Sequence, residues 1–394
     1  MDYILTDGQH ILRVEDIYQN TLNIEGFSKM MKDPSYCYKF FWLEALVKLI
    51  SRGKEQTTFS EIIDEMIINA WYSVVECHVH LSGLNSNGKV QDGLERAILQ
   101  LKKLTDLPGK ASEAELNTKL KEHAEELKKA KTQLTHMVPY RALAGFFGKN
   151  INPRNWDSSI RMVEYIRLFN REHETLPYTL GDSISINKEV YFNPQWMQMI
   201  QDNTVAILGW IQYEKLRWLQ SNNPDIPGIV YKLHSMDDDE KIRKLKKVHD
   251  LWNMILTKEK IEDVFSGQLI NESKYDVDHF IPWSFVMNDE LWNLMPMDPN
   301  LNSSKGNKLP RWEPFFKKFA RNQYILYTHK NDDGINKIFK ECYKDNLHSL
   351  WAIRELYRGE HDEDKFRNVL EENMRPVYDS AKRQGYEVWG YKGV

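Results

Sequence analysis

Apolar residues recur every three to four positions through much of the first 145 residues of this chain. The segments FFWLEALVKLI and FSEIIDEMIINAWYSVVE show this spacing most clearly, and it places apolar side chains on one face of a helix. A further segment, SEAELNTKLKEHAEELKKAKTQLTHM, carries Ser112 and Glu115 in a capping-box arrangement and predicts one long charged helix. We therefore expect a mainly α-helical protein, of the α+β class because short strands are also expected.

Changes in the sequence pattern predict four parts along the chain. A helical N-terminal domain covers residues 1–148, and a mixed helical domain with a few short strands covers 149–270. The strands are expected in LPYTLGDSISINKEVYFNP, where apolar and polar residues alternate around Gly-Asp. A compact module follows at 271–311, and a helical C-terminal extension covers 312–394.

The composition argues against several classes of protein. A net charge of −4 over 394 residues excludes a histone-like polycation, so any nucleic-acid surface must be local. Cys37, Cys77 and Cys342 form no CxxC pair, which argues against a disulfide framework and a cysteine-built zinc site. No apolar run approaches the roughly 20 residues of a membrane span, and the N-terminus lacks the pattern of a signal peptide. We therefore expect a cytoplasmic protein that does not bind membranes.

One stretch combines an apolar strand pattern with two titratable residues. In KYDVDHFIPWSF, residues 274–285, Asp278 and His279 stand side by side in a run that Pro282 stops. LWNLMPM then forms a second strand-like run. NSSKGNKLP, which begins at Asn302, has the capping residues of a short helix followed by Gly and Pro. The order strand, loop, strand, short helix predicts a compact ββα unit.

These residues resemble the HNH endonucleases, which use a ββα-metal fold. The resemblance is to the variety with Asp-His on the first strand and Asn at the start of the helix, as in the HNH domains of CRISPR effector nucleases. It covers residues 272–311. Two departures from the wider family matter: Asn302 stands where many relatives carry histidine, and the zinc-knuckle cysteines of some members are missing. Packing by Trp283, Trp292 and Trp312 is expected to brace the unit instead.

The residue types suit phosphodiester hydrolysis, which needs an activated water and a Lewis acid on the phosphate. His279 is the predicted general base because imidazole titrates near neutrality. Asp278 and Asn302 offer oxygen ligands that suit Mg²⁺ or Mn²⁺ better than zinc. The resemblance implies that Asn293 holds the backbone or ring of His279, and that the products carry a 5′-phosphate and a 3′-hydroxyl. Lys305, on the helical face of Asn302, is predicted to contact the substrate phosphate.

The adjacency of Asp278 and His279 raises a geometric difficulty. Neighbouring residues of a regular strand point to opposite faces, so the two side chains cannot both face one metal ion there. Pro282 ends the ladder just beyond them because it cannot donate a backbone hydrogen bond. We therefore expect a bend or bulge that lets the carboxylate and the imidazole approach one phosphate from two sides.

Basic residues follow the predicted helix directly and are expected to contact a nucleic-acid backbone. They are Lys305, Lys308, Arg311, Lys317, Lys318 and Arg321, against a single acidic residue, Glu313. A second basic segment, KIRKLKK at residues 241–247, is interpreted as a solvated helix face, with nucleic-acid binding as the alternative.

The resemblance implies a metal-dependent endonuclease that hydrolyses DNA. One HNH site cuts one strand per event, so a monomer would nick DNA and a homodimer would cut both strands. The large helical remainder indicates, by analogy of layout, a role in restriction or anti-phage defence under a partner protein such as an ATPase. Two alternatives stay open: a nucleic-acid-binding adaptor subunit with a non-catalytic HNH-like fold, and an RNA nuclease.

Overall fold

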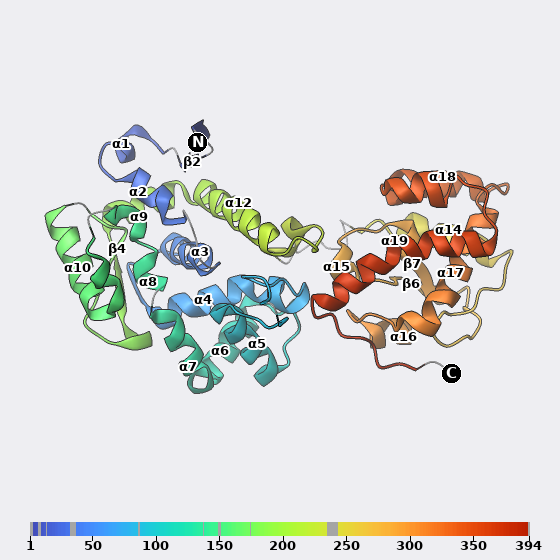
Figure 1. Ribbon diagram of the computed structural model, residues 1–394, viewed down its shortest axis with the longest axis horizontal. Coiled ribbons are helices and arrows are strands. Elements are labelled where there is room, and N and C mark those ends of the chain that lie inside the picture. The colour runs from blue at the N-terminus through green and yellow to red at the C-terminus, as the bar shows by residue number, and fades with distance from the viewer. Residues whose placement is uncertain are drawn as a thin grey trace. The chain divides into compact units, whose positions relative to one another are not determined.

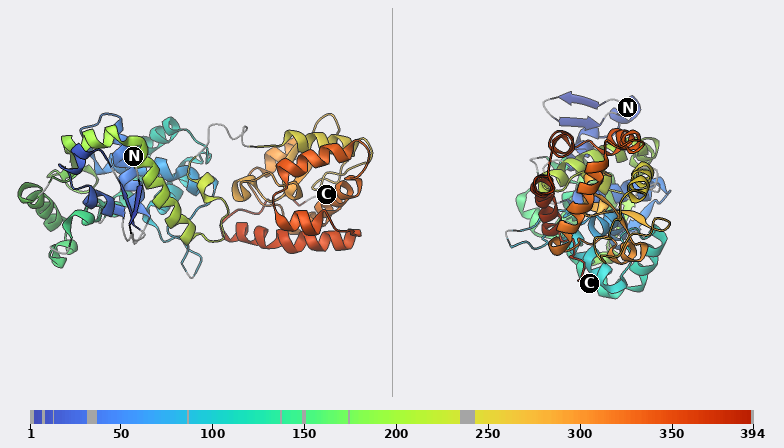
Figure 2. Two further views of the ribbon diagram at one scale, coloured as in Figure 1. Left: turned by 90° about the horizontal axis from the view of Figure 1, so that it is seen from above. Right: turned by 90° about the vertical axis from the view of Figure 1, so that its right-hand side faces the viewer.

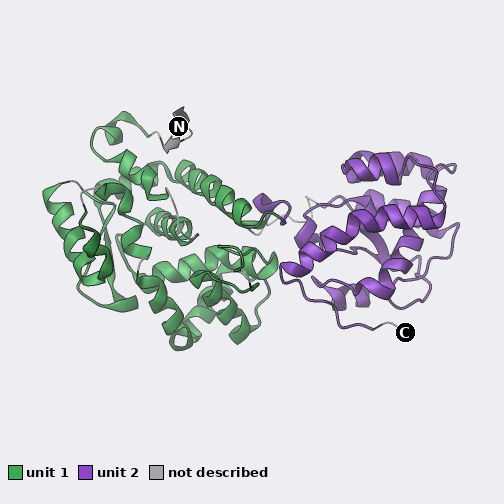
Figure 3. Cartoon of the chain, in the orientation of Figure 1, with its two compact units in different colours: residues 1–224, 232–235 green, residues 225–231, 236–394 purple. Residues whose placement is uncertain are grey.

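The computed structural model describes most of the chain, and the described part is mainly helical with short antiparallel sheets (Figure 1), as the sequence predicted. The chain divides into two compact units, one of residues 1–224 and 232–235 and one of residues 225–231 and 236–394 (Figure 3). This division is coarser than the four parts expected from the sequence, whose boundaries stay a prediction. The described residues are 3–6, 9–12, 14–31, 37–85, 87–136, 138–148, 151–173, 175–234 and 243–392.

The first unit is organised around α3 (Tyr38–Ser51), which packs against α4 (Phe59–Trp71) and α12 (Thr204–Asn222). The apolar spacing of α3 and α4 buries large side chains such as Trp42 and Trp71. Each such buried side chain contributes about 1.5–3 kcal/mol to folding. The shorter or peripheral helices are α1 (Asp16–Gln19), α2 (Ile24–Ser28), α5 (Gly93–Thr105), α6 (Glu113–Glu122), α7 (Ala124–Thr135), α8 (Val138–Arg141), α9 (Ala144–Phe147), α10 (Ser159–Glu172) and α11 (Pro194–Asp202).

The charged segment after Ser112 forms two helices rather than the single long helix that we expected. Ser112 and Glu115 do form the predicted capping box at the start of α6. The prediction of one continuous helix is wrong because His123 takes backbone angles outside the helical range (φ −107°, ψ 26°). This break lets α6 pack against α4 while α7 packs against α5.

The strands of the first unit form two small sheets. β1 (Tyr3–Thr6) and β2 (Gln9–Leu12) pair as a hairpin near the N-terminus (Figure 2). The second sheet has the order β3-β5-β4 and is antiparallel throughout. Its members are β3 (Gln56–Thr58), β4 (Tyr178–Leu180) and β5 (Glu189–Phe192). β4 and β5 confirm the short strands expected from the alternating pattern.

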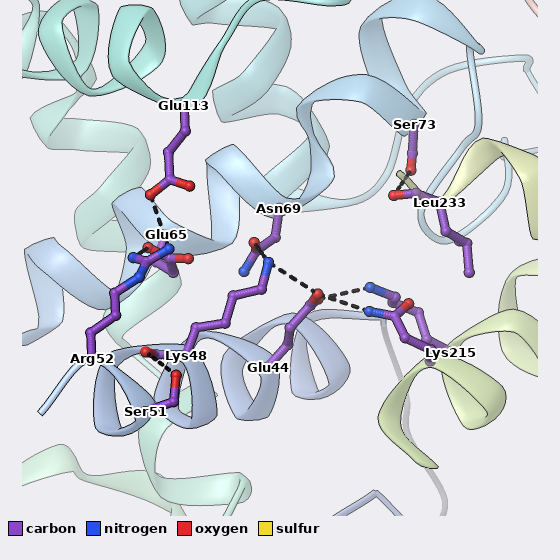
Figure 4. A network of polar contacts seen from close by, with 11 residues as sticks. Glu44, Lys48, Ser51, Arg52, Glu65, Asn69, Ser73, Glu113, Lys215 and Leu233 are labelled. Atoms are coloured by element: carbon purple, nitrogen blue, oxygen red, sulfur yellow. Dashed lines mark hydrogen bonds and ion pairs between the residues drawn. The ribbon is translucent and has the colours of Figure 1, made fainter. Parts of the chain in front are cut away.

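A buried ion pair ties α3 to α12 (Figure 4). Glu44 is fully buried and accepts hydrogen bonds from Lys215 Nζ at 2.7 Å and from Gln212 Nε2 at 2.9 Å. Lys48 lies 3.5 Å from the same carboxylate and donates to Asn69 of α4. Burial alone would raise the pKa of the Glu44 carboxyl, but Lys215 and Lys48 hold it below its ordinary value.

The second unit places a two-stranded sheet within one apolar core. Its helices are α14 (Lys246–Leu256), α15 (Trp283–Val286), α16 (Pro299–Lys305), α17 (Trp312–His329), α18 (Ile335–Asn346) and α19 (Glu363–Arg383). Its strands are β6 (Asp276–His279) and β7 (Leu294–Met297). The strand, strand, helix order predicted for this region is confirmed by β6, β7 and α16.

Single turns of 3₁₀ or π helix interrupt both units. They are η1 (Lys29–Met31), η2 (Tyr72–Glu76), η3 (Pro153–Asp157), η4 (Ser185–Asn187), η5 (Ile229–Lys232), η6 (Leu291–Asn293) and η7 (Ala352–Leu356). No helix in the described part of the chain is long and apolar enough to span a membrane.

The ends of α16 are defined by local side-chain chemistry. Asp298 accepts hydrogen bonds from the backbone N–H groups of Asn300 and Leu301, which caps the N-terminus. Gly306 ends the helix at a φ of +49°, a backbone conformation that strongly favours glycine. Asp263 fixes the helix to the unit because its Oδ2 accepts the Asp298 N–H at 2.9 Å.

Candidate active site

β6 and β7 form a regular antiparallel ladder. Asp276, Val277, Asp278 and His279 pair in turn with Met297, Pro296, Met295 and Leu294. The expected bulge is therefore absent from this ladder, because every residue of β6 opposes one residue of β7. The chain turns only beyond both site residues, at Pro282, which precedes α15. Asp278 and His279 consequently point to opposite faces of the strand.

Two aspartates of β6 face α16. Lys305 Nζ donates to Asp278 Oδ2 at 2.8 Å, and Asn302 Nδ2 donates to Asp276 Oδ2 at 2.9 Å. The structure therefore brings three of the predicted site residues, Asp278, Asn302 and Lys305, to one side of the strand. Asp276 joins them because residues two apart on a strand share a face. Lys305, which we expected to reach substrate, is buried against Asp278.

The donor set on this face suits a hard divalent cation. Asp276 and Asp278 contribute carboxylate oxygens and Asn302 contributes an amide oxygen, and magnesium and manganese prefer such ligands. Across the described ranges, no three His, Cys, Asp or Glu residues group closely enough to hold a metal by themselves. A metal site here would thus depend on the amide oxygen of Asn302. It would also require Lys305 to release Asp278.

His279 points away from α16 and is fully buried. Its Nε2 lies 3.1 Å from the carbonyl oxygen of Asn288 and 3.1 Å from Asp289 Oδ1. Its Nδ1 lies 3.4 Å from Arg243 Nη2. A carbonyl oxygen can only accept a hydrogen bond, so Nε2 is the nitrogen that carries the proton in the neutral ring. Nδ1 is then the basic nitrogen.

Asp289 is held in place from several directions. Its Oδ2 accepts the backbone N–H of Lys244 at 2.7 Å, and its carbonyl oxygen accepts Asn346 Nδ2 at 2.9 Å. Burial alone would raise the pKa of Asp289, but the contacts to His279, to the Lys244 N–H and to Arg243 hold it below its ordinary value. Asp289 therefore presents an ionised carboxylate to the imidazole.

Asn293 contacts the backbone two residues beyond His279 rather than His279 itself. Its side chain accepts the Ile281 N–H at 2.8 Å and donates to the Ile281 carbonyl at 2.9 Å. Its own carbonyl accepts the Phe280 N–H at 2.8 Å. These bonds extend the pairing of the two strands by one step. They fix the path of the chain that leaves His279.

The predicted basic residues lie on and before α17. Lys308, Lys317 and Arg321 are exposed, whereas Arg311 and Lys318 are half-buried. Lys317 and Arg321 are one helical turn apart and so share a face of α17. Arg311 donates to the Lys392 carbonyl at 2.8 Å, which attaches it to the C-terminal segment.

The basic segment at residues 241–247 is not a simple solvated helix face. Lys241 and Ile242 lie outside the described residues, and α14 begins only at Lys246. Arg243 contacts the imidazole of His279 as given above, and Lys247 forms an ion pair with Asp345 at 2.6 Å. The interpretation as a solvated face is therefore wrong for Arg243.

Sequence reasoning missed three residues that contact the site, namely Asp276, Asp289 and Arg243. For Asp276 the signal was present, because its spacing of two from Asp278 places both on one strand face. For Asp289 and Arg243 the sequence offers no such signal. Asp289 lies in an irregular loop, and Arg243 stands 36 residues before His279 in a segment without strand pattern.

The match to known protein families falls on this part of the second unit. Residues 255–311 match the family model described as HNH endonuclease. No curated protein and no solved structure matches the chain. An HNH endonuclease segment indicates nuclease activity on a nucleic-acid substrate, and such nucleases are generally metal-dependent. The chain thus carries an HNH endonuclease segment at residues 255–311 within a larger, mainly helical protein.

Proposed function

We propose that this protein is a metal-dependent endonuclease that hydrolyses DNA phosphodiester bonds. The observation that carries the proposal is the convergence of Asp276, Asp278, Asn302 and Lys305 where α16 meets β6. His279 follows Asp278 on the strand and lies on its opposite face. The carboxylates of the strand and the amide of the helix are of the kind that binds a Lewis-acid metal, and the histidine is of the kind that activates water, which are groups that phosphodiester hydrolysis uses.

Each of these side chains has a specific task in the proposed reaction. Asp278 and Asn302 would hold Mg²⁺ or Mn²⁺, which when bound supplies Lewis-acid stabilisation of charge on the phosphate. His279 would take a proton from water at Nδ1, because Nε2 donates its proton to the Asn288 carbonyl. Asn293 would position His279 through the backbone of Phe280 and Ile281. Lys305 would contact the substrate phosphate once it leaves Asp278.

The exposed cations of the second unit support nucleic acid as the substrate. Lys308, Lys317 and Arg321 lie just after α16 and would neutralise backbone phosphates, with half-buried Arg311 and Lys318 beside them. One such site cuts one strand per event, so the monomer would nick DNA and a homodimer would cut both strands. A role in restriction or anti-phage defence, with a partner such as an ATPase, is proposed by analogy of layout.

A supercoiled plasmid incubated with and without Mg²⁺ or Mn²⁺ tests the proposal. Metal-dependent nicking or linearisation by the wild type should fall by about 10²–10⁴-fold in His279→Ala, the usual contribution of a positioned general base. The exposed His136 of the first unit gives a matched control, since His136→Ala should cleave normally. A His279→Ala protein that cleaves like the wild type would refute the assignment of the base.

The complete burial of His279 favours one alternative, a nucleic-acid-binding adaptor without chemistry. The adaptor predicts that DNA binding survives His279→Ala and that no divalent metal supports cleavage. Single- and double-stranded DNA and RNA should be compared in parallel. Preferential cleavage of RNA would identify an RNA nuclease instead.

A further inference from the structure

Arg243 lies outside the segment that matches the HNH family, in the stretch immediately before α14. Its guanidinium nevertheless reaches the imidazole of His279. Nη2 is 3.4 Å from His279 Nδ1, Nε is 3.9 Å from Asp289 Oδ1, and the guanidinium carbon is 5.8 Å from the centre of the Trp283 ring. The side chain thus lies close to both the Trp283 ring and the buried imidazole.

The contact of Arg243 with His279 blocks the nitrogen that the proposed reaction needs. Nε2 faces two oxygen atoms and carries the ring proton, which leaves the lone pair on Nδ1. A guanidinium can only donate hydrogen bonds, so Arg243 occupies that lone pair. Because His279 is fully buried and Arg243 lies against Nδ1, we expect water to reach Nδ1 only after the arginine has moved.

The contacts of Arg243 are weak enough to be exchanged. The 3.4 Å separation from Nδ1 is longer than a typical N–H···N or N–H···O hydrogen bond. In the part of the chain that the structure describes, the buried Nε of Arg243 makes no hydrogen bond. The side chain is 32% exposed, so it also borders solvent. A phosphate would offer this guanidinium two charge-assisted hydrogen bonds in place of one long bond to a neutral ring.

We propose that Arg243 is an active-site residue with two positions. In the DNA-free protein it covers Nδ1 of His279. When a nucleic-acid backbone enters, it transfers to a phosphate at the scissile bond, which frees Nδ1 and stabilises the charge that develops there. This inference rests on the proposed nuclease function and extends it to a residue outside the family segment.

Two measurements test the inference. The first is the single-turnover cleavage rate of a plasmid in Mg²⁺ by the wild type, Arg243→Ala and Arg243→Lys. Arg243→Ala should lose about 10²–10³-fold, the usual effect of removing one donor to a developing charge. Arg243→Lys should recover part of the loss, because lysine keeps the charge without the bidentate geometry. The exposed Arg354 supplies the control, since Arg354→Ala should cleave normally.

The second measurement does not depend on cleavage. Diethylpyrocarbonate modifies neutral imidazole nitrogens, and mass spectrometry of the DNA-free protein gives its rate at His279. The rate should rise in Arg243→Ala relative to the wild type and to Arg354→Ala, because Nδ1 is then uncovered. Thermal unfolding of each variant identifies any general loss of structure.

The outcomes separate this inference from the proposed function. Failure of the wild type to cleave any nucleic acid would refute the nuclease proposal. The modification rate would still test whether Arg243 shields Nδ1 of His279. Undiminished or faster cleavage by Arg243→Ala would refute the proposal that Arg243 contacts a phosphate at the scissile bond. An unchanged modification rate at His279 would show that Arg243 does not shield Nδ1 in the DNA-free protein. Reduced cleavage together with faster modification is the expected result.

Discussion

The Lys305 ammonium lies 2.8 Å from the Asp278 carboxylate, and the two side chains are 1% and 15% exposed. The helix that carries Asn302 thus also supplies a cation to the carboxylate that would bind a metal. A buried carboxylate without a cation is costly, so this pair stabilises the site in the absence of metal. If Asp278 binds a metal ion as proposed, Lys305 and the metal would compete for one carboxylate.

Replacing Lys305 should expose this competition. Lys305→Met should lower the metal-free stability of the second unit by about 3 kcal/mol, the lower end for a broken buried pair because Asp278 retains some exposure. Added Mg²⁺ or Mn²⁺ should then stabilise the variant more than the wild type. Thermal unfolding and hydrogen exchange of residues 276–305, with and without metal, give the comparison. Lys340→Met, at an exposed position of α18, is the control. Equal stabilisation by metal of the wild type and both variants would contradict competition between Lys305 and metal for Asp278.

Removing a proposed metal ligand should change the metal requirement of cleavage. Asp278→Ala and Asn302→Ala should each raise the Mg²⁺ concentration for half-maximal activity by at least about 10-fold, since loss of even a supporting residue commonly costs that much affinity. Titration of Mg²⁺ in the plasmid assay measures it. The exposed neighbour Asn300 serves as the control through Asn300→Ala. An unaltered Mg²⁺ titration in both ligand variants would remove these residues from the metal site.

The exposed cations of α17 should contribute to DNA binding through phosphates alone. Lys317→Ala and Arg321→Ala should each weaken binding regardless of sequence. Each should also reduce the slope of log K against log salt by about 1, because each neutralises about one phosphate. Fluorescence anisotropy in EDTA at several salt concentrations separates binding from cleavage. Lys337→Ala on α18 is the control and should leave the slope unchanged. An unchanged slope in Lys317→Ala and Arg321→Ala would show that these residues do not contact phosphates.

The Glu44–Lys215 pair should be essential to the first unit. Glu44→Gln should lower its stability by about 3–5 kcal/mol, because Lys215 would remain buried as an uncompensated charge. The double variant Glu44→Leu/Lys215→Met should recover much of the loss. Urea unfolding measures each change. Glu125→Gln breaks the exposed pair with Lys128 and should cost at most about 1 kcal/mol.

The pH dependence of the first unit follows from the same carboxylate. The pKa of Glu44 is lower in the folded protein than in the unfolded chain, where it is about 4.3. Its contribution to stability is therefore complete above that pH and is lost as the pH falls through the lower folded value. The free energy of unfolding of the wild type should therefore decrease as the pH falls through this range. Glu44→Gln should lack this decrease, because glutamine does not titrate. Parallel acid profiles for the two proteins would contradict the lowered pKa.

Much of the site was predictable because its signals are local. The alternation in DVDH, the caps around α16 and the glycine at its end act within a few residues. They favour two strands and a helix through interactions between residues that are close in the sequence. The same locality explains the errors. The break at His123 and the regular path of β6 depend on what each segment packs against, and a local pattern does not contain that information.

The sequence by itself determined the helical class and the capping box at Ser112, and it showed the resemblance of the stretch with Asp278, His279 and Asn302 to HNH endonucleases. The helical class and the capping box follow from periodicity and spacing, which are properties of neighbouring residues, whereas the HNH segment was recognised by its resemblance to the family. Only the tertiary structure decided that Lys305 is buried on Asp278 and that Arg243 lies on His279. Such contacts join residues 27 and 36 positions apart. They form because an apolar core brings distant segments together, and the charged groups carried with them must then find partners.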